Sequence, residues 1–95
     1  MKTKVTLDDQ PLDFIRRRPP EVKRALREAL HQVEAGELSP VPLGDELEGF
    51  CKIKVGDYRL VLQYLPGGGG PGFRVVFAER RKYVYVLFSQ IIGLG

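Results

Sequence analysis

The hydrophobic positions between residues 20 and 36 recur with the spacing of an α-helix. Apolar side chains follow one another at intervals of three and four residues, at Val22, Ala25, Leu26, Ala29, Leu30 and Val33. A proline stands near the start of this segment, and Gly36 follows its end, which are positions that helices favour for these residues. The pattern predicts one amphipathic helix, whose apolar side must be buried against another element.

The residues before this helix predict a short strand and a further helix. KVTL at 4–7 reads as a strand, and Asp8-Asp9 followed by Pro11 is typical of a helix start. Pro19-Pro20 separates the two helices, because proline disrupts a helix interior. The two helices are expected to form a hairpin that covers a sheet further along the chain.

Three alternating segments predict that sheet. Residues 37–49 read as a connection anchored by Leu43 and Leu47, after which 50–55 and 58–65 alternate as strands around a two-residue turn at Gly56-Asp57. PGGGGPG, residues 66–72, is glycine-rich but lacks the Gly-Lys-Ser/Thr ending of a phosphate-binding loop. It is therefore expected to be a flexible connection between strands. FRVVFAE then alternates as a third strand.

Alternation assigns the strand residues to two faces. The face that the helices are expected to cover holds Cys51, Ile53, Val55, Tyr58, Leu60, Leu62, Tyr64, Phe73, Val75 and Phe77. The other face holds Lys52, Lys54, Arg59, Val61, Gln63, Arg74, Val76, Ala78 and, if the strand continues, Arg80. The second face is therefore expected to be an open basic surface.

The last segment, RRKYVYVLFSQIIG, fits two structures. Val84, Leu87, Phe88 and Ile91 lie on one side of a helix, whereas YVYVLF alone also fits a strand, and the longer pattern favours the helix. The sequence thus predicts one α+β domain over residues 1–95. It consists of a small antiparallel sheet packed on an N-terminal helical hairpin, with a short C-terminal helix.

Charge is distributed unevenly along the chain. Residues 1–48 contain 8 Lys/Arg and 10 Asp/Glu, whereas residues 49–95 contain 7 and 2. The basic second half indicates an anionic partner, with RNA, DNA or an acidic protein all possible.

No apolar run suggests a signal peptide or a membrane span, so we expect a soluble cytoplasmic protein. With Cys51 and His31 as the single residues of their types, we expect no metal site and no cofactor.

The basic face raises a question of charge. On this register Lys54 lies opposite Arg59, and Lys52 is on the same face, although like charges opposite one another destabilise a sheet. Each cation by itself is ordinary on an exposed strand face. Together they predict a site for a shared anion such as a phosphodiester, whose developing charge during transfer fixed cations stabilise.

Two stretches carry a family resemblance. LEGFCKIKVGDYRLVLQY, Leu47 to Tyr64, and RRKYVY, Arg80 to Tyr85, resemble motifs of the RelE/ParE superfamily of bacterial and archaeal toxins. The resemblance implies a RelE-like fold. RelE-type members are ribosome-dependent endoribonucleases that cut mRNA in the ribosomal A site, whereas ParE-type members inhibit DNA gyrase and lack most of the catalytic cations.

The resemblance also implies roles for individual residues. Lys52, Lys54 and Arg59 take the positions that contact the phosphate and stabilise the transition state. Arg81 matches the arginine that protonates the leaving oxygen, and Tyr85 matches the tyrosine that activates the 2′-hydroxyl.

Neighbouring residues leave these assignments open. Strand alternation favours Arg80 over Arg81, whereas the spacing to Tyr85 favours Arg81, and Tyr83 is an alternative to Tyr85. Arg74 and Lys82 are expected to bind RNA without a catalytic role.

The resemblance predicts the toxin of a type II toxin-antitoxin system. The predicted activity is an mRNA interferase that inhibits translation, in which a 2′-hydroxyl attack leaves a 2′,3′-cyclic phosphate. The expected partners are a cognate antitoxin, the 70S ribosome and mRNA, without a membrane or a metal. The alternatives are a ParE-type toxin that inhibits gyrase and a degenerate relative that binds RNA or a partner.

Overall fold

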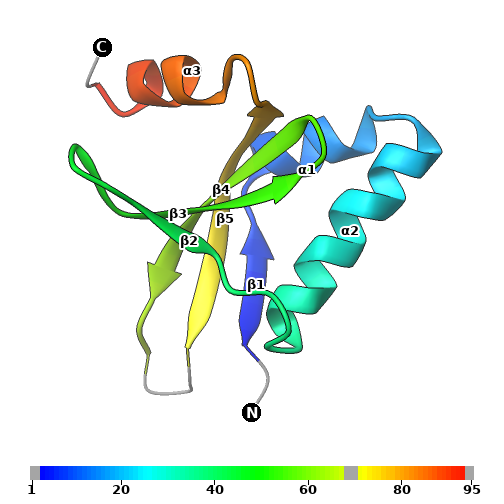
Figure 1. Ribbon diagram of the computed structural model, residues 1–95, viewed down its shortest axis with the longest axis horizontal. Helices are drawn as coiled ribbons and strands as arrows, with labels where there is room; N and C mark the ends of the chain where they lie inside the picture. The colour runs from blue at the N-terminus through cyan, green and yellow to red at the C-terminus, as the bar shows by residue number, and fades with distance from the viewer. Residues whose placement is uncertain (1–2, 68–70, 94–95) are drawn as a thin grey trace.

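The computed structural model describes residues 3–67 and 71–93, which form five strands and three helices around one sheet (Figure 1). The elements in chain order are β1 (Lys4–Leu7), α1 (Asp9–Arg16), α2 (Pro20–Glu34), β2 (Val41–Gly44), β3 (Leu47–Val55), β4 (Tyr58–Leu65), β5 (Gly72–Arg80) and α3 (Val84–Ile91). The strand order is β1-β5-β4-β3-β2, antiparallel from β2 to β5, with β1 parallel to β5. The expected α+β class is confirmed, and the parallel β1 is an addition to it.

The helical hairpin of α1 and α2 covers one face of the sheet, as the sequence predicts. Its main core contains the buried residues Ile15, Leu26, Ala29, Leu30 and Val33 from the helices and Ile53, Leu60, Leu62, Val75 and Ala78 from the strands. Burial of a Leu or Val side chain of this kind stabilises the fold by about 1.5–3 kcal/mol. Gly36 follows α2 with a φ of 77°, a conformation that glycine adopts without strain.

A second, smaller core lies on the opposite face, beneath α3. Val61, Phe77, Val84 and Phe88 are buried there, and Leu43, Leu47 and Phe50 pack around them. Figure 1 shows α3 on the other side of the sheet from α2. The predicted C-terminal helix is confirmed, but Ile91, expected on its buried side, is 65% exposed. Only the first part of this short helix contacts the sheet.

The β3–β4 hairpin has the register that its turn predicts. Val55 lies opposite Tyr58 and Lys54 opposite Arg59. The expected connection over 37–49 is wrong in part, because Val41–Gly44 pair with β3, which itself begins at Leu47. β2 is an edge strand, where proline and glycine are tolerated since one side of the strand makes no ladder.

A β-bulge in β5 changes which residues share a face. Val61 lies opposite Phe77 and Leu62 lies opposite Val75, so Val76 is the extra residue of the bulge. Beyond Val76 the alternation is reversed relative to the sequence pattern. Three residues were therefore assigned to the wrong face: Phe77 lies beneath α3, Ala78 lies in the main core, and Arg80 lies beside Tyr58.

Two expectations concern other parts of the chain. The connection PGGGGPG includes residues 68–70, which lie outside the described residues, so its flexibility stays a prediction. Within residues 3–67 and 71–93, no helix has the length and apolar character to cross a bilayer.

Candidate active site

Arg59 lies on the basic face of the sheet, next to the β3–β4 turn. Arg59 is only 8% exposed, although its guanidinium group is positively charged. Nη1 donates hydrogen bonds to the carbonyl oxygens of Gly56 at 2.9 Å and Tyr58 at 2.8 Å. These bonds hold the guanidinium against the β3–β4 turn. The charge of Arg59 is therefore fixed in place before any ligand binds.

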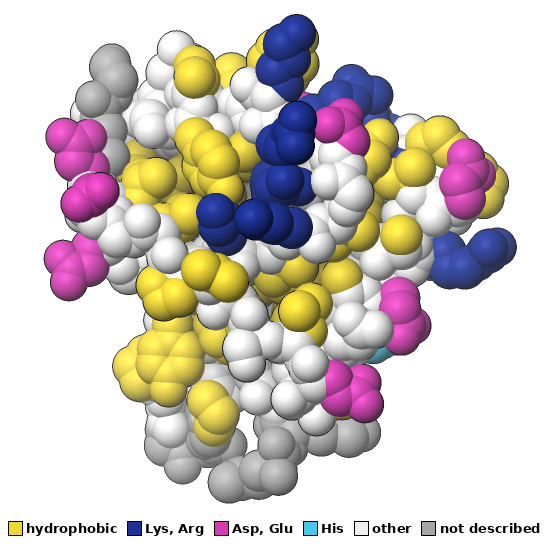
Figure 2. Space-filling view, viewed as in Figure 1, with side chains coloured by type: hydrophobic (Ala, Val, Ile, Leu, Met, Phe, Trp, Pro, Cys, Tyr) yellow, Lys and Arg dark blue, Asp and Glu magenta, His cyan; other side chains and the backbone are white. Residues whose placement is uncertain are grey.

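Two lysines of β3 lie on the same face as Arg59. Lys54 is exposed and stands directly opposite Arg59, and Lys52 is half-buried two residues earlier. Figure 2 shows the Lys and Arg side chains gathered in the middle and upper part of this face, with hydrophobic side chains on both sides. The Nζ atom of Lys52 lies 6.0 Å from the centre of the Tyr85 ring, within the range of a cation–π contact.

Tyr85 joins the two cations from α3. Its hydroxyl oxygen is buried and has no hydrogen-bond partner among the described residues. Burial raises the pKa of this hydroxyl above its ordinary value, and the nearby positive charge of Arg59 opposes part of the rise. The structure thus brings Lys52, Arg59 and Tyr85 together from β3, β4 and α3. In this conformation the phenol is protonated at neutral pH.

Arg81 and Lys82 lie in the turn between β5 and α3, and both are exposed. The backbone N–H of Arg81 donates a 2.8 Å hydrogen bond to the carbonyl of Asp57 in the β3–β4 turn. This bond ties the two turns together. It places Arg81 at the end of the sheet where Lys54 and Arg59 lie.

The secondary candidates Arg80 and Tyr83 are outside this group. The Arg80 guanidinium lies 5.9 Å from the centre of the Tyr58 ring, on the face that α1 and α2 cover. The expectation that strand alternation places Arg80 with the cations is wrong, because the bulge at Val76 reverses its direction. Tyr83 precedes α3 and is 49% exposed.

Arg74 is on the basic face but is already paired. Its Nε and Nη2 atoms donate to the two carboxylate oxygens of Asp8 at 2.7 and 2.8 Å, and this interaction raises the Arg74 pKa. Asp8 stands at the expected N-cap of α1, but its side chain makes no capping hydrogen bond. The ion pair links β5 to the start of α1 and occupies the Arg74 side chain, whose expected binding of RNA stays a prediction.

Glu79 is a residue of this face that the sequence pattern missed. It lies directly opposite Arg59, and its Oε2 atom accepts a 2.7 Å hydrogen bond from the backbone N–H of Arg80. Simple alternation from Phe73 places Glu79 on the helix face. The local sequence holds no signal for the bulge that reverses it, since Val75, Val76 and Phe77 are all ordinary strand residues.

Comparison with known proteins adds evidence about the fold. No family model and no curated protein sequence matches the chain. Among solved structures, a chain of the toxin-antitoxin complex RelBE2 from Mycobacterium tuberculosis superposes with a TM-score of 0.68 at 22% identity, covering 85% of this chain and 100% of that one. The YoeB/ParE toxin from Agrobacterium tumefaciens gives a TM-score of 0.65 at 11% identity, covering 83% of this chain and 99% of that one.

This chain has the RelE-like toxin fold. At these identities the similarity concerns the path of the backbone, so the chemistry has to be argued from the side chains around Arg59.

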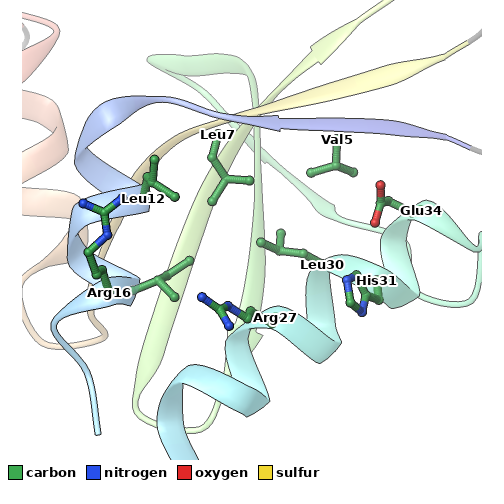
Figure 3. Close-up of a pocket in the computed structure, with 9 residues that line it drawn as sticks. Val5, Leu7, Leu12, Arg16, Arg27, Leu30, His31 and Glu34 are labelled. Carbon is green, nitrogen blue, oxygen red and sulfur yellow. The ribbon is translucent and has the colours of Figure 1, made fainter. Parts of the chain in front are cut away.

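The RelE-like fold of this chain also contains a groove between α1, α2 and β1, with a volume of about 300 Å³ (Figure 3). Val5 and Leu7 extend into it from β1, and Leu30 extends into it from α2. Polar residues from both helices line it as well, namely Arg16, Arg27, His31 and Glu34. The groove is on the helix side of the sheet, away from Arg59.

Two further observations concern potential metal ligands and the thiol in the described part of the chain. No three His, Cys, Asp or Glu side chains come together there as metal ligands. Cys51 is buried, and burial raises the pKa of its thiol, which disfavours the reactive thiolate.

Proposed function

We propose that this protein is the toxin of a type II toxin-antitoxin system and that it cleaves mRNA in the A site of the ribosome. The observation that carries the proposal is the convergence of Lys52, Arg59 and the Tyr85 hydroxyl at one place on a RelE-like fold. Two cations beside a hydroxyl fit a phosphodiester better than they fit a hydrophobic partner.

In the proposed reaction the 2′-oxygen of one nucleotide attacks the phosphorus that follows it. The P–O5′ bond breaks, which leaves a 2′,3′-cyclic phosphate on one fragment and a 5′-hydroxyl on the other. Lys52, Lys54 and Arg59 hold the non-bridging oxygens and stabilise the charge that builds on them. The side chain of Arg81, at the edge of the group, donates a proton to the leaving 5′-oxygen.

In this scheme Tyr85 first releases its own proton to solvent, and the resulting phenolate accepts the proton of the 2′-hydroxyl. In the free protein its hydroxyl oxygen is buried, and burial raises the pKa of this group further above neutral pH. Movement of the phenol toward Lys52, Arg59 and solvent lowers its pKa, because the desolvation is relieved and nearby cations favour the charged form. The need for this change gives a physical reason why the enzyme requires the ribosome to position the message.

The test is cleavage of a defined mRNA held in purified ribosomes. The protein is expected to cut within the A-site codon and to leave a 2′,3′-cyclic phosphate. The double variant Lys52→Ala/Lys54→Ala is expected to cleave more slowly by about 100-fold or more, the usual cost of removing charge stabilisation. Arg24→Ala, which removes an exposed cation of α2, is the control. A message that stays intact with the unsubstituted protein rejects the proposal.

The burial of the Tyr85 hydroxyl favours one alternative, a ParE-type toxin that does not cleave RNA. In that alternative the basic face binds a protein target such as DNA gyrase. Inhibition of gyrase in a supercoiling assay, together with an intact message on the ribosome, selects it. A chain that does neither and causes no growth arrest when expressed is a degenerate relative that binds RNA or a partner.

We also propose that a cognate antitoxin binds this protein. The groove of α1, α2 and β1 has apolar walls and two arginines at its edge, which suits an acidic amphipathic segment of such a partner. Relief of growth arrest by the product of a neighbouring gene, with recovery of a stable complex, checks this proposal.

A further inference from the structure

A row of three charges crosses the basic face of the sheet. Lys54 of β3 lies opposite Arg59 of β4, and Arg59 lies opposite Glu79 of β5. Across the paired strand residues 50–55, 58–65 and 72–80, Glu79 is the sole acidic residue. With Lys52 included, the group has a net charge of +2 instead of the +3 of its cations alone.

The bulge at Val76 is what places Glu79 in this row. Its neighbours confirm the reversal independently, because Phe77 is buried beneath α3 and Ala78 is buried in the main core. Gln10 of α1 holds the backbone of Ala78 through two hydrogen bonds of 2.8 Å, one donated and one accepted. The strand after the bulge is therefore fixed, and the backbone of Glu79 has a defined position opposite Arg59 on the neighbouring strand.

A carboxylate in this position has two opposite effects. It offsets the repulsion between Lys54 and Arg59 in the free protein, since opposite charges across neighbouring strands stabilise a sheet. It also repels the phosphate that the proposed reaction requires, because Coulomb interactions between unit charges reach over several ångströms near a protein surface. A phosphodiester that binds here has to overcome this repulsion.

We infer that Glu79 is a specificity-determining residue that limits the affinity of the site for isolated RNA. The inference rests on the proposed function and concerns the same site. Glu79 weakens the attraction of Lys52, Lys54 and Arg59 for any single-stranded phosphodiester. RNA therefore binds productively only where a larger partner supplies further contacts, which restricts cleavage to messages held in place.

The test compares Glu79→Gln with the unsubstituted protein. Glutamine removes the charge but keeps a side-chain oxygen to accept the Arg80 N–H, so the backbone contact is preserved. The probe is a short fluorescent RNA whose nucleotides are all 2′-O-methylated, which cannot be cleaved because it has no 2′-hydroxyl. Its dissociation constant is measured by fluorescence anisotropy at several salt concentrations.

Glu79→Gln is expected to bind the probe about threefold more tightly, with a steeper salt dependence, because one repulsive charge is removed. Glu28→Gln is the matched control, since it makes the same change of net charge at an exposed position of α2. It is expected to bind as the unsubstituted protein does. Glu79→Asp retains the negative charge and is also expected to bind the probe with the affinity of the unsubstituted protein.

The double variant Lys52→Ala/Lys54→Ala distinguishes failure of the inference about Glu79 from failure of the proposed function. If this variant binds weakly but Glu79→Gln binds no more tightly than the unsubstituted protein, the inference is wrong and the proposed site stands. If the double variant binds the probe as well as the unsubstituted protein, RNA does not use this face. The proposed function and the inference then fail together.

Discussion

The two faces of the five-stranded sheet differ in how completely they are covered. On one face α1 and α2 enclose a core of aliphatic side chains from both helices and from β3, β4 and β5. On the other face α3 covers a smaller core, and the adjoining part of the sheet carries Lys52, Lys54, Arg59 and Glu79.

The difference shows which face of the sheet contains features that lower the stability of the fold. The helix-covered face contains apolar contacts that any well-packed core requires. The basic face holds two cations opposite each other and a buried tyrosine hydroxyl with no partner in the described structure, both of which are unfavourable for folding alone. Features that cost stability are expected at functional sites, where selection acts on chemistry. Substitutions on the two faces should therefore have opposite consequences.

The largest effect is expected from Leu26→Ala on the helix-covered face. Leu26 is fully buried, and its truncation leaves a cavity that should lower the free energy of unfolding by about 3 kcal/mol. Chemical denaturation measures this loss. Activity per folded molecule should be unchanged, and Leu12→Ala, at a position that is 45% exposed, is the control for a small loss. Equal losses at the two positions contradict the assignment of the core.

The next effect distinguishes the adjacent arginines. Arg81→Ala should slow ribosomal cleavage by about 100-fold, a typical contribution of a proton donor, with little change in stability. Arg80→Ala should leave the cleavage rate nearly unchanged, because its side chain lies against Tyr58 on the opposite face. Single-turnover cleavage rates measure both. If Arg80→Ala loses more of the cleavage rate than Arg81→Ala does, the register after the bulge at Val76 is wrong, and so is the site that depends on it.

A smaller change in stability than that of Leu26→Ala, and of opposite sign, is expected from Tyr85→Phe. Removing a buried hydroxyl that has no hydrogen-bond partner among residues 3–67 and 71–93 should raise the free energy of unfolding by about 1 kcal/mol while cleavage is lost. Thermal denaturation at neutral pH, paired with the cleavage assay, checks both signs. A destabilised Tyr85→Phe variant indicates that the hydroxyl makes a hydrogen bond in solution.

The same variant has a predicted dependence on pH. The Tyr85 pKa is raised in the folded state, so the folded chain keeps this proton after the unfolded chain, with its ordinary value near 10.0, has lost it. Stability therefore falls as the pH rises from about 10 toward the folded pKa. Below about pH 10 the titration of Tyr85 does not change stability. The stability difference between Tyr85→Phe and the unsubstituted protein should grow over this alkaline range.

Much of the architecture follows from local sequence. The apolar spacing from Val22 to Val33 predicts α2, and the Gly56-Asp57 turn sets the β3–β4 register by itself, because a two-residue turn leaves one way to pair the flanking residues. The positions of Lys54 and Arg59 opposite each other follow directly. Helix α3 was also predicted, although only its first turns are buried.

What local sequence did not determine lies beyond the bulge in β5. Whether a bulge forms at Val76 depends on pairing with β4, on the parallel contact with β1 and on the hydrogen bonds from Gln10 to Ala78, which is 68 residues away. A shift of one residue turns every later side chain to the other face. Alternation along the sequence therefore places Arg80 with the cations and puts Glu79 on the opposite face.

Apart from β2, the sequence alone thus determined which segments form helices and strands, because helical spacing and turn chemistry act over a few residues. The tertiary structure decided which charges share a face. It set Glu79 beside Arg59 and enclosed the Tyr85 hydroxyl beneath α3, because strand pairing and packing join residues that are far apart in the chain.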